Sequence, residues 1–210
     1  MTLIRRFTGG GTVVVDQDTL FTSLIMQHQS LPGVEPYPRP VMRYTEHLYD
    51  TVFGRHGPFH LRENDYCFGD VKFGGNAQAI TKDRWLHHTS LLWDFQQPRM
   101  ALLKHPDRQP EYRQGRDHLD FVVRLKDRLP CRATLADQLC SSLEAAGFCL
   151  QESCLAEAEE ALAANKLCGT RQLEWPQVLA EERQRLQQEQ GQGQHQDQGL
   201  NAATAGTSQA

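Results

Sequence analysis

The 210-residue sequence lacks any apolar run near the ~18 residues that cross a bilayer. It also lacks the apolar core of a secretion signal at its start, because Met1 leads within a few residues into Arg5, Arg6 and a run of glycines. We therefore expect no membrane association and, as the sequence stands, a cytoplasmic protein. A mitochondrial or plastid location would require a transit peptide ahead of this sequence.

Paired cysteines are missing as well. The six cysteines form no Cys-x-x-Cys pair and follow no regular spacing, at positions 67, 131, 140, 149, 154 and 168. We expect free thiols in a reducing compartment instead of disulfides or a structural zinc site. No firm set of metal ligands stands out.

A dense basic face is also lacking. Residues 1–128 contain 17 lysines and arginines against 15 aspartates and glutamates, and the whole chain carries a net charge of −4. Recognition of a nucleic-acid duplex usually needs a denser positive surface, so we expect no nucleic-acid partner. A mildly basic first part suits an anionic small ligand or an acidic protein.

Apolar residues make up only 39% of the chain, which indicates that part of it adds nothing to a core. Seven of the twelve residues from Gln187 to Gln198 are glutamine, and the remainder is small or polar. Such a composition buries too little apolar surface to offset the entropy lost on ordering. We expect a core over residues 1–128, a helical segment over 129–186 and a disordered tail over 187–210.

Strand patterns lie mainly in the first half of the chain. Val13–Val15 and Thr19–Met26 are rich in β-branched and apolar residues, and a short polar turn joins them, which predicts a hairpin. Tyr66–Phe68 and Val71–Phe73 flank Gly69-Asp70, a pair that suits a tight turn in a second hairpin.

Helical patterns flank these strands. The spacing of Val41, Tyr44, Leu48 and Val52 predicts a buried helical stripe that ends near Gly54. A further strand is expected over 85–95, and further helices are expected from a cap at Thr134 to Gly147, over 157–166 and over 175–187. Strands crowd the first half and helices the second, so we expect an α+β fold with a mixed or antiparallel sheet flanked by helices.

Three consecutive glycines, Gly9–Gly11, follow the segment Arg5-Arg6-Phe7-Thr8. We expect these glycines to let backbone N–H groups approach a ligand closely, most commonly the oxygens of a phosphate. No Gly-Lys-Ser/Thr follows and a strand is expected next, so neither a Walker loop nor a helix N-terminus explains them. The plain alternative is a glycine-rich turn before a strand.

Lys72 is the second candidate for chemistry. It lies on a predicted hairpin strand just before Gly74 and Gly75, where its ammonium could project into an open cleft and bind phosphate. The alternative is a solvated surface lysine. The adjacent His87 and His88 point to opposite faces of a strand, so they cannot jointly chelate one metal in the usual way.

Four motifs in order resemble the lipoate-protein ligase A family, within the biotin/lipoate ligase catalytic fold. They are Arg-Arg-x-Thr-Gly-Gly-Gly-x-Val from Arg5, Arg-x-Asn-Asp from Arg62, Lys-x-Gly-Gly-Asn-Ala-Gln from Lys72, and His-His-Thr-Ser-Leu-Leu from His87. The resemblance runs from about Leu3 to Phe95 and continues weakly through Tyr112-Arg113 and residues 116–121, as in the plant and algal branch.

This resemblance implies ATP-dependent lipoylation in two steps. The carboxylate of lipoate attacks the α-phosphate of ATP to give lipoyl-adenylate and pyrophosphate, with Mg²⁺ neutralising the leaving group. A lysine of an apo lipoyl domain then takes the acyl group. The acceptors implied are the E2 subunits of 2-oxoacid dehydrogenases or the glycine cleavage H protein.

The family pattern also implies site residues. Lys72 matches the lysine that touches both the lipoate carboxylate and the phosphate. The positions that match those holding nucleotide and acyl-adenylate are Arg5, Gly10, Gly11, Thr12 and Val13. The residues expected to line the acyl and adenylate pocket are Gly74, Gly75, Asn76 and Ala77, with Asn64, Asp65 and His88 as further candidates.

Family members normally carry a substantial segment before the Arg-Arg motif, which here begins at residue 5. We therefore expect a catalytic core that is short at its N-terminus. Three other functions stay open: an octanoyl or lipoyl transferase that uses Cys67 or Cys131 on a thioester donor, a biotin ligase, and a non-catalytic remnant that binds lipoyl-adenylate or an acceptor domain.

Overall fold

The computed structural model describes residues 2–105, 109–164, 169–184 and 187. These residues form two compact units. One comprises Thr8–Ala163, and the other joins the N-terminal residues up to Phe7 with the described residues from Ala164 onward. Among the described residues, no helix combines the length and the apolar character needed to cross a membrane.

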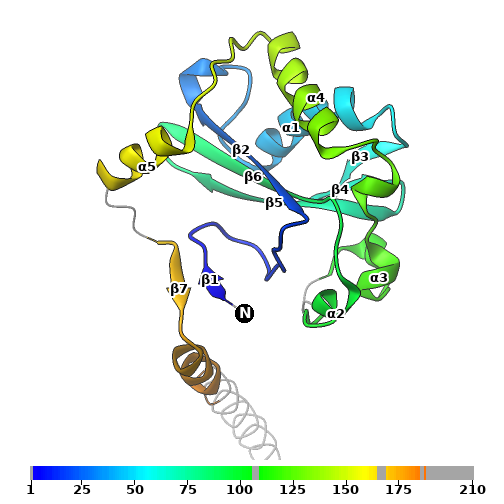
Figure 1. The fold of residues 1–210 in the computed structure, drawn as a ribbon, viewed down its shortest axis with the longest axis vertical. Helices are drawn as coiled ribbons and strands as arrows, with labels where there is room; N and C mark the ends of the chain where they lie inside the picture. Colours follow the sequence, from blue (N-terminus) through cyan, green and yellow to red (C-terminus); the bar gives the residue numbers. More distant parts are fainter. Residues whose placement is uncertain (1, 106–108, 165–168, 185–186, 188–210) are drawn as a thin grey trace, which may run out of the picture. The chain divides into compact units, whose positions relative to one another are not determined.

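The larger unit is built on a five-stranded sheet in which every neighbouring pair of strands is antiparallel (Figure 1). Its spatial order is β2-β6-β5-β4-β3. The strands are β2 (Thr19–Gln27), β3 (Phe59–Arg62), β4 (Asp65–Phe68), β5 (Val71–Ile80) and β6 (Arg84–Leu92). The expected α+β class with an antiparallel sheet is therefore confirmed.

Helix α1 (Pro38–Phe53) covers one face of this sheet. Its buried stripe includes Val41, Leu48 and Val52 and ends at Gly54, as the spacing predicts. Phe53 packs against Phe68 and Phe73 of the sheet, with ring centroids 6.3 and 4.8 Å away. The main apolar core therefore lies between α1 and strands β3 to β6.

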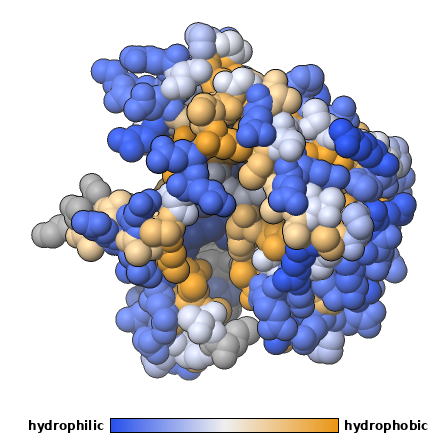
Figure 2. Space-filling model, turned by 45° about the horizontal axis from the view of Figure 1, so that its top comes forward, coloured by the Kyte–Doolittle hydropathy of each residue, from blue (hydrophilic) through white to orange (hydrophobic). Residues whose placement is uncertain are grey.

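Every second side chain of edge strand β2 points away from this core. Burial alternates along β2, and Phe21 and Ile25 remain 52% and 63% exposed. Apolar side chains consequently reach the molecular surface between hydrophilic ones (Figure 2).

Helix α4 (Arg132–Ala145) packs against α1 and extends the core. Leu135 is buried, and Ser142 donates a 2.7 Å hydrogen bond to the carbonyl oxygen of Leu48. The helix begins earlier than expected, because Cys131, and not Thr134, is the N-cap, with its sulfur 3.4 Å from the Thr134 amide.

The remaining elements are short. They are the α-helices α2 (Gln97–Met100), α3 (His118–Phe121) and α5 (Leu155–Ala164), and the 3-10 helices η1 (His28–Ser30), η2 (Glu111–Arg113) and η3 (Leu125–Asp127). The hairpin predicted over 66–73, the strand over 85–95 and the helix over 157–166 correspond to β4 with β5, to β6 and to α5.

The hairpin predicted for Val13–Val15 and Thr19–Met26 is wrong. Residues 11–16 belong to no strand, and β2 pairs with β6 instead. Val13 and Val15 are about half exposed, so these β-branched side chains lack the packed surface that would favour a strand. A turn in which the Thr19 amide donates to the Asp16 carbonyl leads directly into β2.

The second unit contains β1 (Leu3–Arg5), which pairs antiparallel with β7 (Arg171–Leu173). A helix over residues 175–184 follows, in line with the prediction of a helix there. Arg5 forms an ion pair with Glu181 of that helix. Apart from residue 187, the tail expected over 187–210 lies outside the described residues.

Leu135→Ala tests whether α4 is an integral part of the core. We expect the free energy of unfolding to fall by about 2–5 kcal/mol, because a fully buried leucine leaves a cavity when truncated. The control is Leu155→Ala in α5, where the side chain is 74% exposed and a change within about 0.5 kcal/mol is expected. Equal losses in chemical denaturation would contradict this packing.

Candidate functional site

A β-bulge between β4 and β5 organises the candidate site. Tyr66 pairs with Gly74, but the next residue, Cys67, pairs with Lys72, so that Phe73 is skipped. Bulges of this kind re-aim the side chains that follow them and are over-represented near active sites.

The bulge changes which side chains share a face of β5. Phe73 is fully buried in the core, and a Cβ on Gly74 would lie 3.4 Å from the Cβ of Tyr66, so both face α1. Adjacent residues of a regular strand face opposite sides. Because the alternation is delayed by one residue, Lys72 and Gly75 lie together on the other face of the sheet.

Gly75 leaves room for the Lys72 ammonium. A Cβ at position 75 would lie 3.3 Å from Lys72 Nζ and 3.5 Å from its Cε. The ammonium is held in this position by Asp65, whose Oδ1 is 2.7 Å from Nζ. Asp65 pairs with Gly75 in the sheet, so all three groups come from adjacent strand positions.

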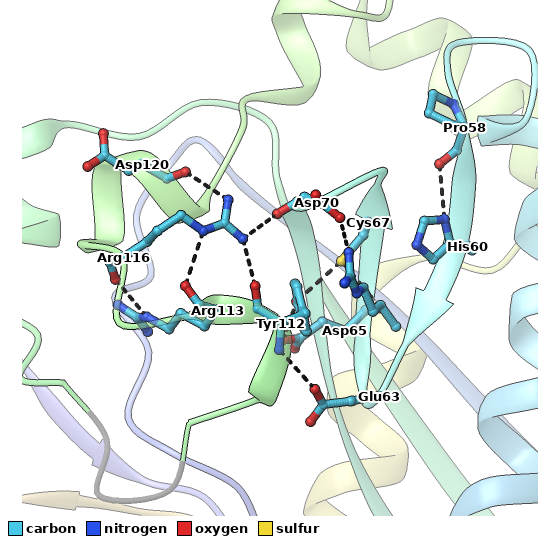
Figure 3. Close-up of polar contacts among 11 residues, drawn as sticks. Pro58, His60, Glu63, Asp65, Cys67, Asp70, Tyr112, Arg113, Arg116 and Asp120 are labelled. Carbon is cyan, nitrogen blue, oxygen red and sulfur yellow. Dashed lines mark hydrogen bonds and ion pairs between the residues drawn. The ribbon is translucent and has the colours of Figure 1, made fainter.

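The second carboxylate oxygen of Asp65 accepts a hydrogen bond from Tyr112. The hydroxyl of Tyr112 donates to Oδ2 at 2.8 Å, and Cys67 Sγ lies 3.3 Å from the same hydroxyl (Figure 3). Burial, reinforced by the charge of Asp65, raises the pKa of Tyr112. The phenol therefore remains protonated and acts as a donor at neutral pH.

Arg62 and Arg116 fasten the segment that carries Tyr112 to the β4–β5 hairpin. Arg116 Nη2 donates to the Asp70 carbonyl at 2.8 Å and to the Tyr112 carbonyl at 3.0 Å (Figure 3). Arg62 lies over the Tyr112 ring, 4.7 Å from its centroid, and pairs with Asp70. Beyond this segment, the amide of Val123 donates to the Lys72 carbonyl at 2.8 Å.

A hollow of about 330 Å³ lies beside the second half of β5. Strand β4 begins at Asp65, opposite Gly75, so among the described residues no strand pairs with 76–80 on that side. Asn76 Nδ2 donates to the Asn64 carbonyl at 2.6 Å. The hollow is lined by Gly9, Gly10, Pro38, Met42, Asn64, Asn76, Ala77 and Gln78.

Several predicted site residues meet at this hollow. Gly10, Asn64, Asn76 and Ala77 line it although they come from three separate segments. Gly10 adopts φ of 100°, a conformation that favours glycine.

Lys72 does not line the hollow itself. Its ammonium is positioned by Asp65 and Gly75, the sequence neighbours of the lining residues Asn64 and Asn76. The hollow is bordered by Pro38 and Met42 of α1, whereas Lys72 lies on the sheet face away from α1, so the cationic group and the hollow are distinct parts of the site.

Other predicted residues lie elsewhere. Gly11, Thr12 and Val13 belong to the irregular segment before β2 and do not line the hollow. Arg5 lies on β1 in the other unit, paired with Glu181.

His87 and His88 face opposite sides of β6, as the strand pattern predicts. His88 Nδ1 lies 2.6 Å from the Ser23 hydroxyl, whereas His87 is fully buried, with Nε2 3.0 Å from the Tyr66 hydroxyl. Burial lowers the pKa of His87 to about 4, so this ring is neutral at physiological pH. In the described part of the chain, no group of three or more histidine, cysteine or acidic side chains could hold a metal ion.

Comparisons with known proteins agree with the resemblance in the motifs. The family model of the lipoyl protein ligase A/B catalytic domain matches residues 1–145. The chain belongs to this family. The match extends through α4, the helix that completes the core.

Relatives in this family include proteins of parasites and bacteria. The chain is 30% identical over 161 residues to inactive lipoate–protein ligase 2 of Plasmodium falciparum, covering 60% of this chain and 41% of that protein. It is 30% identical over 133 residues to the probable lipoate-protein ligase A of Mycoplasma pneumoniae, covering 63% and 38%. The chain thus spans about two fifths of the length of these curated relatives.

Solved structures share the fold. A bipartite lipoate protein ligase of Thermoplasma acidophilum, described with its E2 lipoyl domain, superposes with a TM-score of 0.60 at 24% identity, covering 77% of this chain and 64% of that one. A lipoate-protein ligase A bound with ATP gives a TM-score of 0.60 at 22% identity, covering 77% and 66%.

Tyr112 is the site residue that sequence reasoning missed. It lies 40 positions after Lys72, and only the weak continuation of the family resemblance through Tyr112-Arg113 pointed to it. Its hydrogen bond to Asp65 depends on the return of a distant loop, which no local pattern encodes.

The two cysteines considered as nucleophiles differ in environment. Burial raises the pKa of the Cys67 thiol to about 11, so it stays protonated at neutral pH. The exposed Cys131 has a lowered pKa because its sulfur accepts hydrogen bonds at the start of α4, from the Thr134 hydroxyl foremost. Cys67 Sγ contacts the Tyr112 hydroxyl, and Cys131 belongs to the cap of a packed helix.

Alkylation tests this difference. With iodoacetamide at pH 7.5, we expect Cys131 to react at least ~10-fold faster than Cys67, because only the thiolate attacks and Cys67 is also buried. Peptide mass spectrometry after timed quenching measures both rates in one sample. Rapid labelling of Cys67 in the folded chain would mean that its thiol is activated after all.

Proposed function

We propose that this chain carries the catalytic site of a lipoate-protein ligase, which activates lipoate with ATP and transfers the lipoyl group to a lysine of an acceptor lipoyl domain. The observation that carries the proposal is the Lys72 ammonium, held over Gly75 by Asp65 on the strand that also lines a hollow of glycine and asparagine. The family membership of residues 1–145 supports it.

In the first step, a lipoate carboxylate oxygen bonds to the α-phosphorus of ATP while the bond to pyrophosphate breaks. Negative charge accumulates on the α-phosphate oxygens as this happens. A fixed cation at that position lowers the barrier, since preorganised charge needs no reorganisation during the reaction. We assign this role to Lys72.

The hollow would receive the adenylate. Gly9 and Gly10 approach it with backbone alone, and a Cβ on Gly9 would meet no protein atom within 4 Å. We propose that the backbone of this glycine segment approaches the phosphate oxygens of the adenylate. The amide side chain of Asn76 and the backbone of Asn64 form the opposite wall.

Asp65 has a different task from Lys72. In the free protein it neutralises the ammonium at 2.7 Å. Because both its oxygens are already engaged by Lys72 and Tyr112, we expect Mg²⁺ to enter with the phosphates of ATP and not on a cage of protein ligands.

In the second step, the amine of the acceptor lysine bonds to the acyl carbon, loses a proton, and AMP leaves. The choice of acceptor class is supported by the Thermoplasma ligase, a structural neighbour that is described with its E2 lipoyl domain. We therefore propose an apo lipoyl domain of an E2 subunit or a glycine cleavage H protein as the acceptor.

Binding without turnover is the second candidate function. One relative at 30% identity is named an inactive ligase, and the chain spans only part of its relatives. Thioester transfer is less well supported, because the protonated and buried Cys67 is a poor nucleophile.

Lys72→Ala tests the central assignment. We expect the rate of lipoyl-adenylate formation to fall at least ~10²-fold, the usual cost of losing one preorganised electrostatic group. The purified full chain is assayed with lipoate, ATP, Mg²⁺ and an apo lipoyl domain, and mass gain on the acceptor is measured. Lys82→Ala, at an exposed turn lysine, is the matched control and should keep the wild-type rate.

Unchanged lipoylation by Lys72→Ala would refute its role. If the wild-type chain binds ATP and lipoate in calorimetry but modifies no acceptor, the second candidate function is favoured instead.

Gly75→Ala tests the space beside the ammonium. The added methyl would displace the flexible end of Lys72 by a few tenths of an ångström, so we expect folding to be kept and adenylate formation to slow about 10-fold or more. Gly33→Ala, where a Cβ meets nothing within 4 Å, is the control. A wild-type rate with Gly75→Ala would show that the ammonium position is unimportant.

A further inference from the structure

We propose that Tyr112 is a positioning residue, which fixes the Asp65 carboxylate and through it the Lys72 ammonium. The catalytic meaning of this inference rests on the proposed function. The geometry behind it belongs to the free protein and can be tested separately.

The two oxygens of Asp65 are divided between two partners. Oδ1 pairs with Lys72 Nζ at 2.7 Å, and Oδ2 accepts from the Tyr112 hydroxyl at 2.8 Å. A carboxylate held at one oxygen alone can rotate about its terminal bond. With the second oxygen anchored, the plane of the carboxylate is set, and so is the point at which it holds the ammonium.

Tyr112 is itself fixed from several sides. Its side chain is buried, its ring packs against Phe121 with centroids 5.2 Å apart, and the Arg62 guanidinium covers the ring. Arg116 binds its carbonyl, and its amide donates to Glu63 Oε1 at 3.4 Å. The hydroxyl oxygen is therefore held in one place, beside Asp65 Oδ2 and Cys67 Sγ.

The nature of the donor also suits this role. A phenol held neutral by burial donates its proton without adding charge. A lysine or arginine in its place would compete with Lys72 for the carboxylate. Tyr112 thus orients Asp65 while leaving its negative charge for the ammonium.

The kinetic experiment compares Tyr112→Phe with Tyr44→Phe, which removes a hydroxyl from a helix residue that packs against Trp85. For Tyr112→Phe we expect kcat for adenylate formation to fall about 10- to 100-fold, as for a small displacement of a reacting group. KM for ATP and for lipoate should change less than about 3-fold. Tyr44→Phe should match wild type.

A double-mutant cycle identifies the route of the effect. If Tyr112 acts through Asp65, then in an Asp65→Asn background the further change Tyr112→Phe should alter kcat less than about 2-fold. Full additivity of the two substitutions would overturn the inference.

Chemical labelling tests the positioning without any activity. Trace acetylation with acetic anhydride reports how readily an amine reaches the reagent, and an amine held against a carboxylate at 2.7 Å is less accessible than a freely moving one. We expect Tyr112→Phe to raise labelling of Lys72 at least about 3-fold relative to Lys82 in the same molecule, as measured by peptide mass spectrometry. Asp65→Asn should raise it as much or more and should serve as the second variant if Tyr112→Phe fails to fold.

These two readouts separate the proposals. If the wild-type chain forms no lipoyl-adenylate, the proposed function fails while the labelling still decides the role of Tyr112. Lys72 labelling that is unchanged in Tyr112→Phe, or in Asp65→Asn when that variant stands in, would overturn the positioning role even in an active enzyme.

Discussion

The position of one ammonium group depends on a single irregularity in the sheet, the skipped pairing at Phe73. In a regular strand, Lys72 would share its face with Gly74, and Gly75 would face α1. With the bulge, Lys72 shares its face with Gly75, and Gly74 faces α1. Burial of Phe73 among the aromatic side chains beneath α1 stabilises the bulge. A packing interaction on one face of the sheet thus sets the electrostatics of the other.

The ion pair between Lys72 and Asp65 holds a cation in place near the surface of the protein. Lys72 keeps 28% of its side chain exposed, so the pair is partly solvated and contributes at most about 1 kcal/mol, like other pairs near a surface. Because Asp65 itself is buried and is also bonded to Tyr112, the ammonium keeps its position while its exposed part can face an anionic group.

Local patterns in the sequence predicted the elements that depend on interactions between neighbouring residues. The apolar stripe of α1 and the turn at Gly69-Asp70 needed only nearby residues, and both were found. The false strand at Val13–Val15 shows the limit, because β propensity without a packed partner surface does not make a strand. The bulge at Phe73 and the contact of Tyr112 with Asp65 depend on contacts between distant segments, which the periodicity of the sequence does not reveal.

For the site, the ordered motifs supplied the candidate residues. Only the fold shows which of them line the hollow, such as Gly10 and Asn76, and that Arg5 belongs to the other unit.

The side chains on the two faces of β5 have different roles. Side chains directed at α1, such as Phe73, are buried in the core, so changes to them act on folding. On the other face, Cys67, Tyr112 and Phe121 form a second buried cluster, and the placement of Lys72 needs the space at Gly75. Membership of the family accounts for the shared fold, whereas the proposed activity requires the arrangement of Lys72, Asp65 and Gly75.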